Sequence, residues 1–178
     1  MAKEEPLLYR KMYLNSFLNL VVFAPSYFLI VQYFVNDNGS VYFAEIFIII
    51  LFHNIYYALT HYGMHTLDIL KPIHRYHHQY RKNIIPTVGN AVTIKEMFLA
   101  YLTPFVFCSI IFQPAMNSLI AGVGVISVFN LLVHSTYLSN TNWIRGLVSP
   151  ALHIAHHNLY TKHFSAPLLN LDRLLGLC

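Results

Sequence analysis

The sequence predicts an all-α integral membrane protein with four transmembrane helices in two hairpins and a cytoplasmic, helical, histidine-rich cap. Three observations support this prediction. The 178 residues are 56% hydrophobic and only 10% charged, whereas soluble domains carry about 25% charged residues. Four segments are apolar enough to cross a bilayer, and the Lys and Arg residues lie outside them. Most of the eleven histidines are grouped near the ends of these segments.

The four expected spans follow from the length that a bilayer demands. Crossing the ~30 Å hydrocarbon core takes about 20 mostly apolar residues of helix. We place the spans at approximately 14–35, 41–59, 97–112 and 119–138. The last two come from one run without Asp, Glu, Lys or Arg, which Pro114 divides. The chain is therefore expected to form a single membrane-embedded domain, 1–178, with histidine regions at 61–93 and 134–178.

The basic residues predict how the chain sits in the membrane. They precede the first expected span, separate the second from the third, or follow the fourth: Lys3, Arg10, Lys11, Lys71, Arg75, Arg81, Lys82, Lys95, Arg145, Lys162 and Arg173. The positive-inside rule then puts both termini and the central loop in the cytoplasm. This is the inner membrane in a bacterium and the endoplasmic reticulum in a eukaryote. Because no single element carries clustered basic residues, a nucleic-acid partner is not expected.

The histidines occur in four motifs that share a spacing. They are HYGMH, HRYHH, NLLVH and HIAHH, which contain His61, His65, His74, His77, His78, His134, His153, His156 and His157. Residues three and four apart lie on one side of a helix, so HYGMH, HRYHH and HIAHH can each present their imidazoles together, while NLLVH adds a single one. Each motif also lies at or beyond the cytoplasmic end of an expected span. The nine side chains are therefore expected to converge on one site at the membrane surface.

The number of histidines predicts two metal ions. Imidazole binds Zn, Cu, Fe and Ni, and a structural zinc takes four ligands. Nine histidines exceed what one ion can use, whereas two ions with four or five nitrogen ligands each fit the count. The count does not identify the element. We interpret His53 as a packed, neutral residue bonded to a neighbouring span, and His163 as either a supporting or an exposed residue.

Other classes of protein fit the pattern less well. A metal transporter needs polar groups through its span centres, but only Glu45 and His53 are ionisable there. A haem cytochrome needs histidines paired across facing spans, and the HxxHH triplets do not serve that purpose. The alternative that remains is a non-catalytic protein, or a histidine-rich protein that binds or transports metal.

The motif set, followed by LDRLLG near the C-terminus, resembles the fatty acid hydroxylase superfamily. That superfamily contains sterol desaturases and the sphingolipid and fatty acid hydroxylases. The resemblance runs from about Tyr57 to Leu175 and rests on the combination of motifs. The ending FSAPLLNLDRLLG is similar to that of hydroxylase-like members, which favours hydroxylation while leaving desaturation open.

The resemblance implies a membrane-bound enzyme with a non-haem centre of two iron ions. It implies O2 as co-substrate, a membrane lipid such as a fatty acyl, sphingoid or sterol compound as substrate, and electrons from a separate haem carrier or NAD(P)H-dependent reductase. The nine histidines named above match the family's ligand positions. Asn130 and Asp172 also match recurrent positions, with orienting or structural roles.

Overall fold

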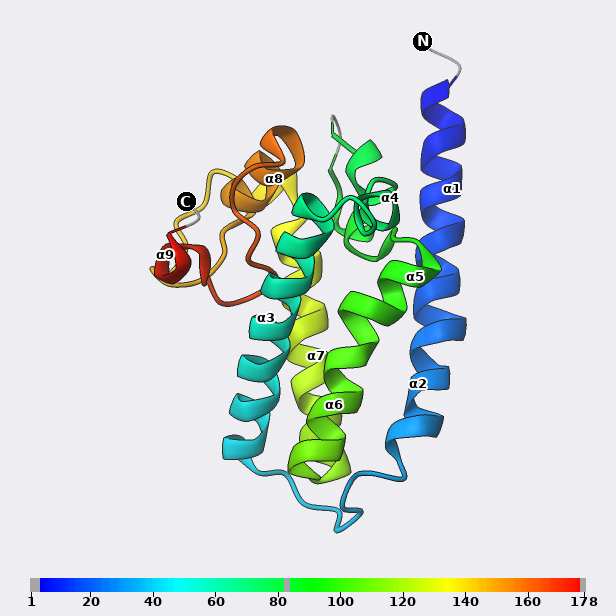
Figure 1. The fold of residues 1–178 in the computed structure, drawn as a ribbon, viewed down its shortest axis with the longest axis vertical. Helices are drawn as coiled ribbons and strands as arrows, with labels where there is room; N and C mark the ends of the chain where they lie inside the picture. The colour runs from blue at the N-terminus through cyan, green and yellow to red at the C-terminus, as the bar shows by residue number, and fades with distance from the viewer. Residues whose placement is uncertain (1–3, 82–83, 177–178) are drawn as a thin grey trace.

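The computed structural model describes residues 4–81 and 84–176, and no β-strand occurs among them. Four of the described helices are long and apolar enough to cross a membrane: Pro6–Val31, Phe43–Thr66, Ile94–Phe112 and Met116–Val133. Figure 1 shows how they are arranged. The expected all-α class is therefore confirmed, and four helices that could cross a membrane are present, as expected. Lys3 and Lys82, two of the basic residues that predict the orientation, lie outside the described residues.

The first and third spans are each interrupted by a π-helical segment. The first consists of α1 (Glu4–Leu18), η1 (Asn19–Phe23) and α2 (Ala24–Val31). The third consists of α5 (Ile94–Glu96), η4 (Met97–Leu102) and α6 (Thr103–Phe112). Each π-helical segment ends two residues before a proline, Pro25 or Pro104. Because proline has no backbone N–H and crowds the preceding turn, a wider turn at this point relieves the helix.

The first, second and fourth spans end at residues other than those expected, and the first ends at Val31 instead of near residue 35. The helix α3 (Phe43–Thr66) continues past residue 59, so it carries the whole HYGMH motif. The helix α7 (Met116–Val133) stops before residue 138. There the His134 ring bonds to the Asn130 carbonyl at 2.7 Å, and the His134 backbone N–H turns to the Leu132 carbonyl instead. The side chain thus takes the carbonyl to which the His134 backbone N–H would bond if the helix continued.

The spans that follow one another in the sequence are not all neighbours. The helix α3 packs mainly on α7 and α6, and α2 packs on α6, so that α6 lies between α2 and α3 in Figure 1. The connections after α2 and α6 meet at the end opposite the N-terminus. There Asn36 donates its N–H to the Pro114 carbonyl at 2.9 Å and accepts one from Met116 at 3.0 Å.

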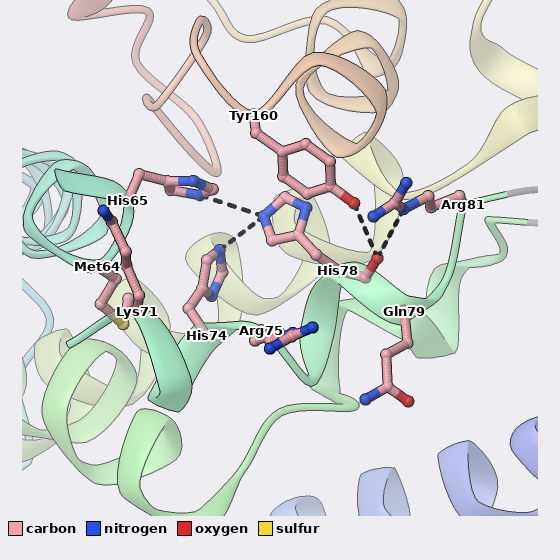
Figure 2. A pocket seen from close by; sticks show the side chains of 9 residues that line it. All are labelled: Met64, His65, Lys71, His74, Arg75, His78, Gln79, Arg81 and Tyr160. Carbon is pink, nitrogen blue, oxygen red and sulfur yellow. Dashed lines mark hydrogen bonds between the residues drawn. The ribbon is translucent and has the colours of Figure 1, made fainter. Parts of the chain in front are cut away.

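Short helices at the other end, near the start of α1, form a cap over the spans (Figure 1). They are α4 (Lys71–His74), η2 (His77–Gln79), η3 (Pro86–Asn90), η5 (Thr136–Leu138), α8 (Pro150–Leu159) and α9 (Asp172–Leu175). The hydroxyl of Ser149 accepts a hydrogen bond from the Leu152 N–H at 3.3 Å and so caps α8, whose first residue is Pro150. In Figure 2, the cap and the end of α3 bring His65, His74 and His78 together.

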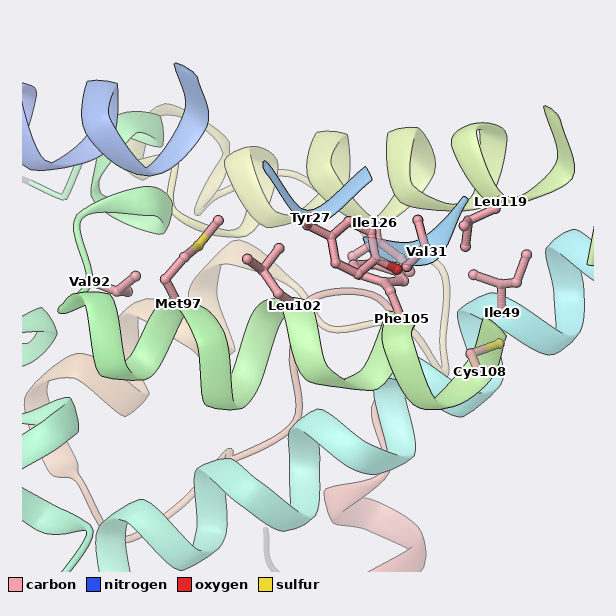
Figure 3. Packing of buried hydrophobic residues seen from close by; sticks show 10 residues of the cluster. All are labelled: Tyr27, Val31, Ile49, Val92, Met97, Leu102, Phe105, Cys108, Leu119 and Ile126. Atoms are coloured by element: carbon pink, nitrogen blue, oxygen red, sulfur yellow. The ribbon is translucent and has the colours of Figure 1, made fainter. Parts of the chain in front are cut away.

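The core between the spans is apolar, and the outer surface of the spans is apolar as well. Figure 3 shows the buried side chains, which include Tyr27, Ile49, Phe105 and Leu119. At the α3–α7 contact a Cβ on Gly122 would lie 2.8 Å from Ile49 Cγ2, so only glycine permits this approach. Large apolar side chains also face outward on all four spans, among them Leu14, Phe47, Ile111 and Val128. This distribution is what lipid-facing helices require.

Candidate metal centre

The nine predicted histidines come together at the cap end of the bundle. His61 and His65 lie in the last turns of α3, and His134 directly follows α7. The remaining six come from the cap: His74 from α4, His77 and His78 from η2, and His153, His156 and His157 from α8. All nine are buried except His65, which is partly exposed.

The histidines divide into two groups, each of which can hold a metal ion. The five-histidine group consists of His61, His65, His74, His78 and His156. The four-histidine group consists of His77, His134, His153 and His157. Within each group, the nitrogen atoms that would bind the ion all lie within 4.8 Å of one another.

In the five-histidine group the Nε2 atoms face a common point. His61 Nε2 lies 2.8 Å from His74 Nε2 and 3.1 Å from His156 Nε2. His78 Nε2 lies 2.9 Å from His74 Nε2 and 3.2 Å from His65 Nε2. Two nitrogen atoms that bind one ion at right angles, each at about 2.1 Å, would be about 3.0 Å apart. The spacing therefore fits ligands around a single ion.

In the four-histidine group, ring nitrogen atoms also lie close enough together to bind a single ion. His134 Nε2 lies 2.8 Å from His153 Nε2 and 3.3 Å from His77 Nε2. Both ring nitrogens of His157 are buried and have no hydrogen-bond partner among the residues that the structure describes, although its ring centroid lies 4.7 Å from that of His77. A buried imidazole with no partner is costly, and a metal ion would supply one.

The hydrogen bonds of three rings show which of their nitrogen atoms is free to bind a metal ion. The Nδ1 atoms of His61, His134 and His156 contact backbone carbonyls at 2.6–2.7 Å, and a carbonyl only accepts a hydrogen bond. Each Nδ1 must therefore carry the proton, which leaves a lone pair on the Nε2 of the neutral ring. His61 and His156 then direct two lone pairs at each other across 3.1 Å. An ion between them would turn this repulsion into binding.

The two groups are adjacent, and both HxxHH motifs contribute to each. His74 and His78 belong to the five-histidine group, whereas His77, between them, belongs to the other. In α8 the assignment is reversed, because His156 joins the five-histidine group and its two neighbours in the motif, His153 and His157, join the other. The His78 and His157 rings meet at a centroid distance of 4.8 Å across the boundary.

Burial keeps His134 and the six histidines of the cap neutral. Loss of hydration lowers the pKa of His134 and His156 to about 4. The same cause, with neighbouring rings adding to it, lowers the pKa of the other cap histidines well below the usual value: His74, His77, His78, His153 and His157. These seven rings are neutral at pH 7, which is the form that binds metal.

The sequence analysis missed one carboxylate that supports the site. Glu96, in the first turn of the third span, is fully buried, and its Oε1 accepts a hydrogen bond from His74 Nδ1 at 2.5 Å. A carboxylate behind a metal-binding histidine orients the ring and raises its basicity. The available signal was the position of Glu96, the last acidic residue before a long run without charge.

Asn130 and Asp172 act on the ligands through the backbone. The carbonyl of Asn130 holds His134, and its side-chain amide donates to the Gly89 carbonyl at 3.1 Å. The Asp172 carboxylate accepts hydrogen bonds from the Phe164 and Ser165 N–H groups at 2.9 and 2.8 Å. The carbonyl of Phe164 is the group that orients His61.

His53 and His163 belong to neither group. His53 is buried in α3, and its ring packs on Tyr57 and, at 4.7 Å between centroids, on Phe105 of the neighbouring α6. The expected packing is present, but the structure gives no hydrogen bond from the His53 ring to a neighbouring span among the described residues, and its Nδ1 is buried without a partner there. His163 is half-buried, and its Nδ1 also lacks a partner there.

A helical membrane protein with two histidine groups capable of holding metal is the class that the fold and the site define. The family model of the fatty acid hydroxylases matches residues 45–177, which is most of the chain. The protein therefore belongs to the fatty acid hydroxylase family, as the motifs indicated, and this family implies an oxidoreductase. No curated protein and no solved structure matches the chain significantly.

Proposed function

We propose that the protein oxidises a membrane lipid with O2, by hydroxylation or desaturation, at a non-haem centre of two iron ions. The observation that carries this proposal is the division of nine histidines into adjacent groups of five and four. Bound iron would supply the oxidising power that no amino-acid side chain has toward a lipid C–H bond.

The residues fit two iron ions by number and by chemistry. Imidazole suits iron, and an ion with six ligand positions would keep one position free in the five-histidine group and two in the other. The hydrogen bonds from His61, His134 and His156 to backbone carbonyls hold these rings in the tautomer that binds through Nε2. Glu96 accepts the hydrogen bond from His74 Nδ1, so it holds His74 in the same tautomer and contributes a carboxylate beside the site.

The place of the site suits a lipid substrate. His65 lies one residue before the end of α3, so the five-histidine group would sit where a span leaves the hydrocarbon region. A lipid could then present its chain to the ions without leaving the bilayer entirely. We place this end of the bundle, with both termini, in the cytoplasm by the positive-inside rule, in the inner membrane of a bacterium or the endoplasmic reticulum of a eukaryote. The electrons would come from a separate haem carrier or NAD(P)H-dependent reductase.

The first experiment is to measure the metal content of the purified protein. Iron, zinc and haem per chain would be measured in mild detergent, with the double variant His77→Ala/His156→Ala as control, since it removes one ligand from each group. About two irons without haem in the wild-type protein, and fewer in the variant, are expected. A lipid screen for added oxygen or lost hydrogen, by mass spectrometry, would follow.

Other outcomes would point to other functions. A haem spectrum, or the absence of bound metal, would contradict the proposal. Two zinc ions would support the ligand set but not the iron, and reconstitution with ferrous iron followed by the lipid screen would then decide. Metal binding with no lipid oxidation in the presence of an electron donor would favour a non-catalytic or metal-transporting protein.

A further inference from the structure

An open pocket of about 590 Å³ lies beside the five-histidine group (Figure 2). Three of the five histidines line it, together with three basic residues and no carboxylate: Met64, His65, Lys71, His74, Arg75, His78, Gln79, Arg81 and Tyr160. We call it the basic pocket. A volume of this size is typical of sites for small molecules. A second, smaller cavity of about 70 Å³, between the spans, is lined by none of the nine histidines.

The basic pocket has more positive than negative charge. Lys71 pairs with Asp68 at 2.7 Å, but within the described ranges neither Arg75 nor Arg81 has a carboxylate partner. The nine histidines bring no negative charge, and the Glu96 carboxylate faces His74 without lining the pocket. Two bound metal cations would therefore add to the positive potential. A cleft lined by charges of one sign attracts ligands that carry the opposite charge.

The position of Arg81 is held by specific contacts. Its Cζ lies 4.7 Å from the centroid of the Tyr160 ring, and its Nε donates to the His78 carbonyl at 3.3 Å. The Tyr160 hydroxyl donates to the same carbonyl at 3.3 Å. The Tyr160 ring also lies 4.6 Å from the His78 ring. One tyrosine ring therefore separates the Arg81 guanidinium from a predicted ligand.

The backbone of Tyr160 helps to fix where its ring lies. Tyr160 follows the last residue of α8 in the left-handed conformation, with φ 60, and its N–H donates to the His156 carbonyl. Helices often end in this way, although glycine is the usual residue at such a position. Here it places the ring between the guanidinium and the histidines, as Figure 2 shows.

We propose that the basic pocket binds the anionic head of the lipid substrate, a carboxylate or a phosphate, through Arg75 and Arg81. This proposal rests on the proposed function and narrows its substrate class to acid-headed lipids, as opposed to sterols and other neutral lipids. The planar guanidinium group matches both carboxylate and phosphate oxygens with paired hydrogen bonds. The head would stay at the membrane surface, with the adjoining chain beside the five-histidine group.

The test compares matched lipids on iron-loaded, full-length protein in a neutral detergent. Dissociation constants would be measured for dodecanoate, dodecyl phosphate and dodecanol, with inorganic phosphate as the soluble anion. Arg75→Gln/Arg81→Gln is expected to weaken binding of both anionic lipids about tenfold or more and to leave dodecanol unchanged. Arg145→Gln removes the same kind of charge from an exposed residue that does not line the pocket, and is expected to change nothing.

The iron content of each sample keeps the outcomes distinct. Because Arg81 contacts the His78 carbonyl, the single variant Arg75→Gln would be measured as well, and several-fold weaker binding is expected with iron retained. The proposal would be overturned if dodecanol bound as tightly as the anionic lipids. It would also be overturned if Arg145→Gln weakened the binding of the anionic lipids as much as Arg75→Gln/Arg81→Gln does. Inorganic phosphate binding as tightly as dodecyl phosphate would overturn its lipid part. If iron is bound and neutral lipids are oxidised in preference, the proposed function stands and this inference fails.

Discussion

The two histidine groups differ in their access to solvent, although they share motifs and lie side by side. The five-histidine group borders the basic pocket through His65, His74 and His78, and His65 is partly exposed. The four-histidine group is buried throughout, and none of its members lines that pocket. A molecule that enters the basic pocket would therefore meet the first group. The second group, with fewer ligands and no opening there, would depend on every one of its histidines.

The largest expected effect comes from removing a ligand from the four-histidine group. His153→Ala leaves three imidazoles there, whereas His65→Ala leaves four in the other group. We expect His153→Ala to lose one metal ion per chain and all lipid oxidation, and His65→Ala to retain both ions with weaker binding. Metal analysis after size-exclusion chromatography would check this. Equal metal loss in the two variants would show that the groups do not differ as proposed.

A smaller effect is expected from the carboxylate behind His74. Glu96→Gln keeps the shape of the side chain but weakens its bond to His74 Nδ1. Metal affinity of the five-histidine group should fall about 10- to 100-fold, while the other group is unaffected. Competition with a chelator of known affinity would measure this. The matched control is Glu45→Gln, at the opposite end of the bundle, where Glu45 accepts the Ala115 N–H; a similar loss of metal there would contradict the role given to Glu96.

A substitution at Gly89 tests how His134 of the four-histidine group is held in place. A Cβ at this position would lie 2.9 Å from Asn130 Nδ2 and 3.0 Å from His134 Nδ1. Gly89→Ala is expected to displace His134 and to lower stability by about 1–3 kcal/mol, as overpacking does. Thermal unfolding and metal content would be measured together. In Gly124→Ala the new Cβ meets nothing within 4 Å, so no loss is expected, and a loss equal to that of Gly89→Ala would refute this explanation.

The smallest expected effect is a difference between the two histidine groups of the intact protein in the rate at which their metal ions leave. A small water-soluble chelator can approach the five-histidine group through the basic pocket, which no member of the four-histidine group lines. Metal should therefore leave in two phases, one ion before the other, when samples are taken over time. A single phase that releases both ions together would mean that access does not separate them.

The sequence by itself predicted the spans and the residues of the candidate site. Apolar length was sufficient to predict four spans, the last two from the charge-free run 97–144, because the bilayer sets the length of a crossing helix. The spacing of the motifs selected the nine histidines that the structure gathers, and their number pointed to two ions. Local patterns carry this information because residues three and four apart share a helix face whatever the helix packs against.

The tertiary structure decided how those residues are divided and supported. Spacing in HRYHH does not reveal that His77 turns toward His134 while His74 and His78 turn toward His61 and His65, since that depends on where η2 meets α7 and α3. The same holds for Glu96, which reaches His74 from another segment, and for Tyr160, which is placed by the end of α8. These contacts join residues far apart in the chain, so they exist only once the spans have packed and brought the cap segments together.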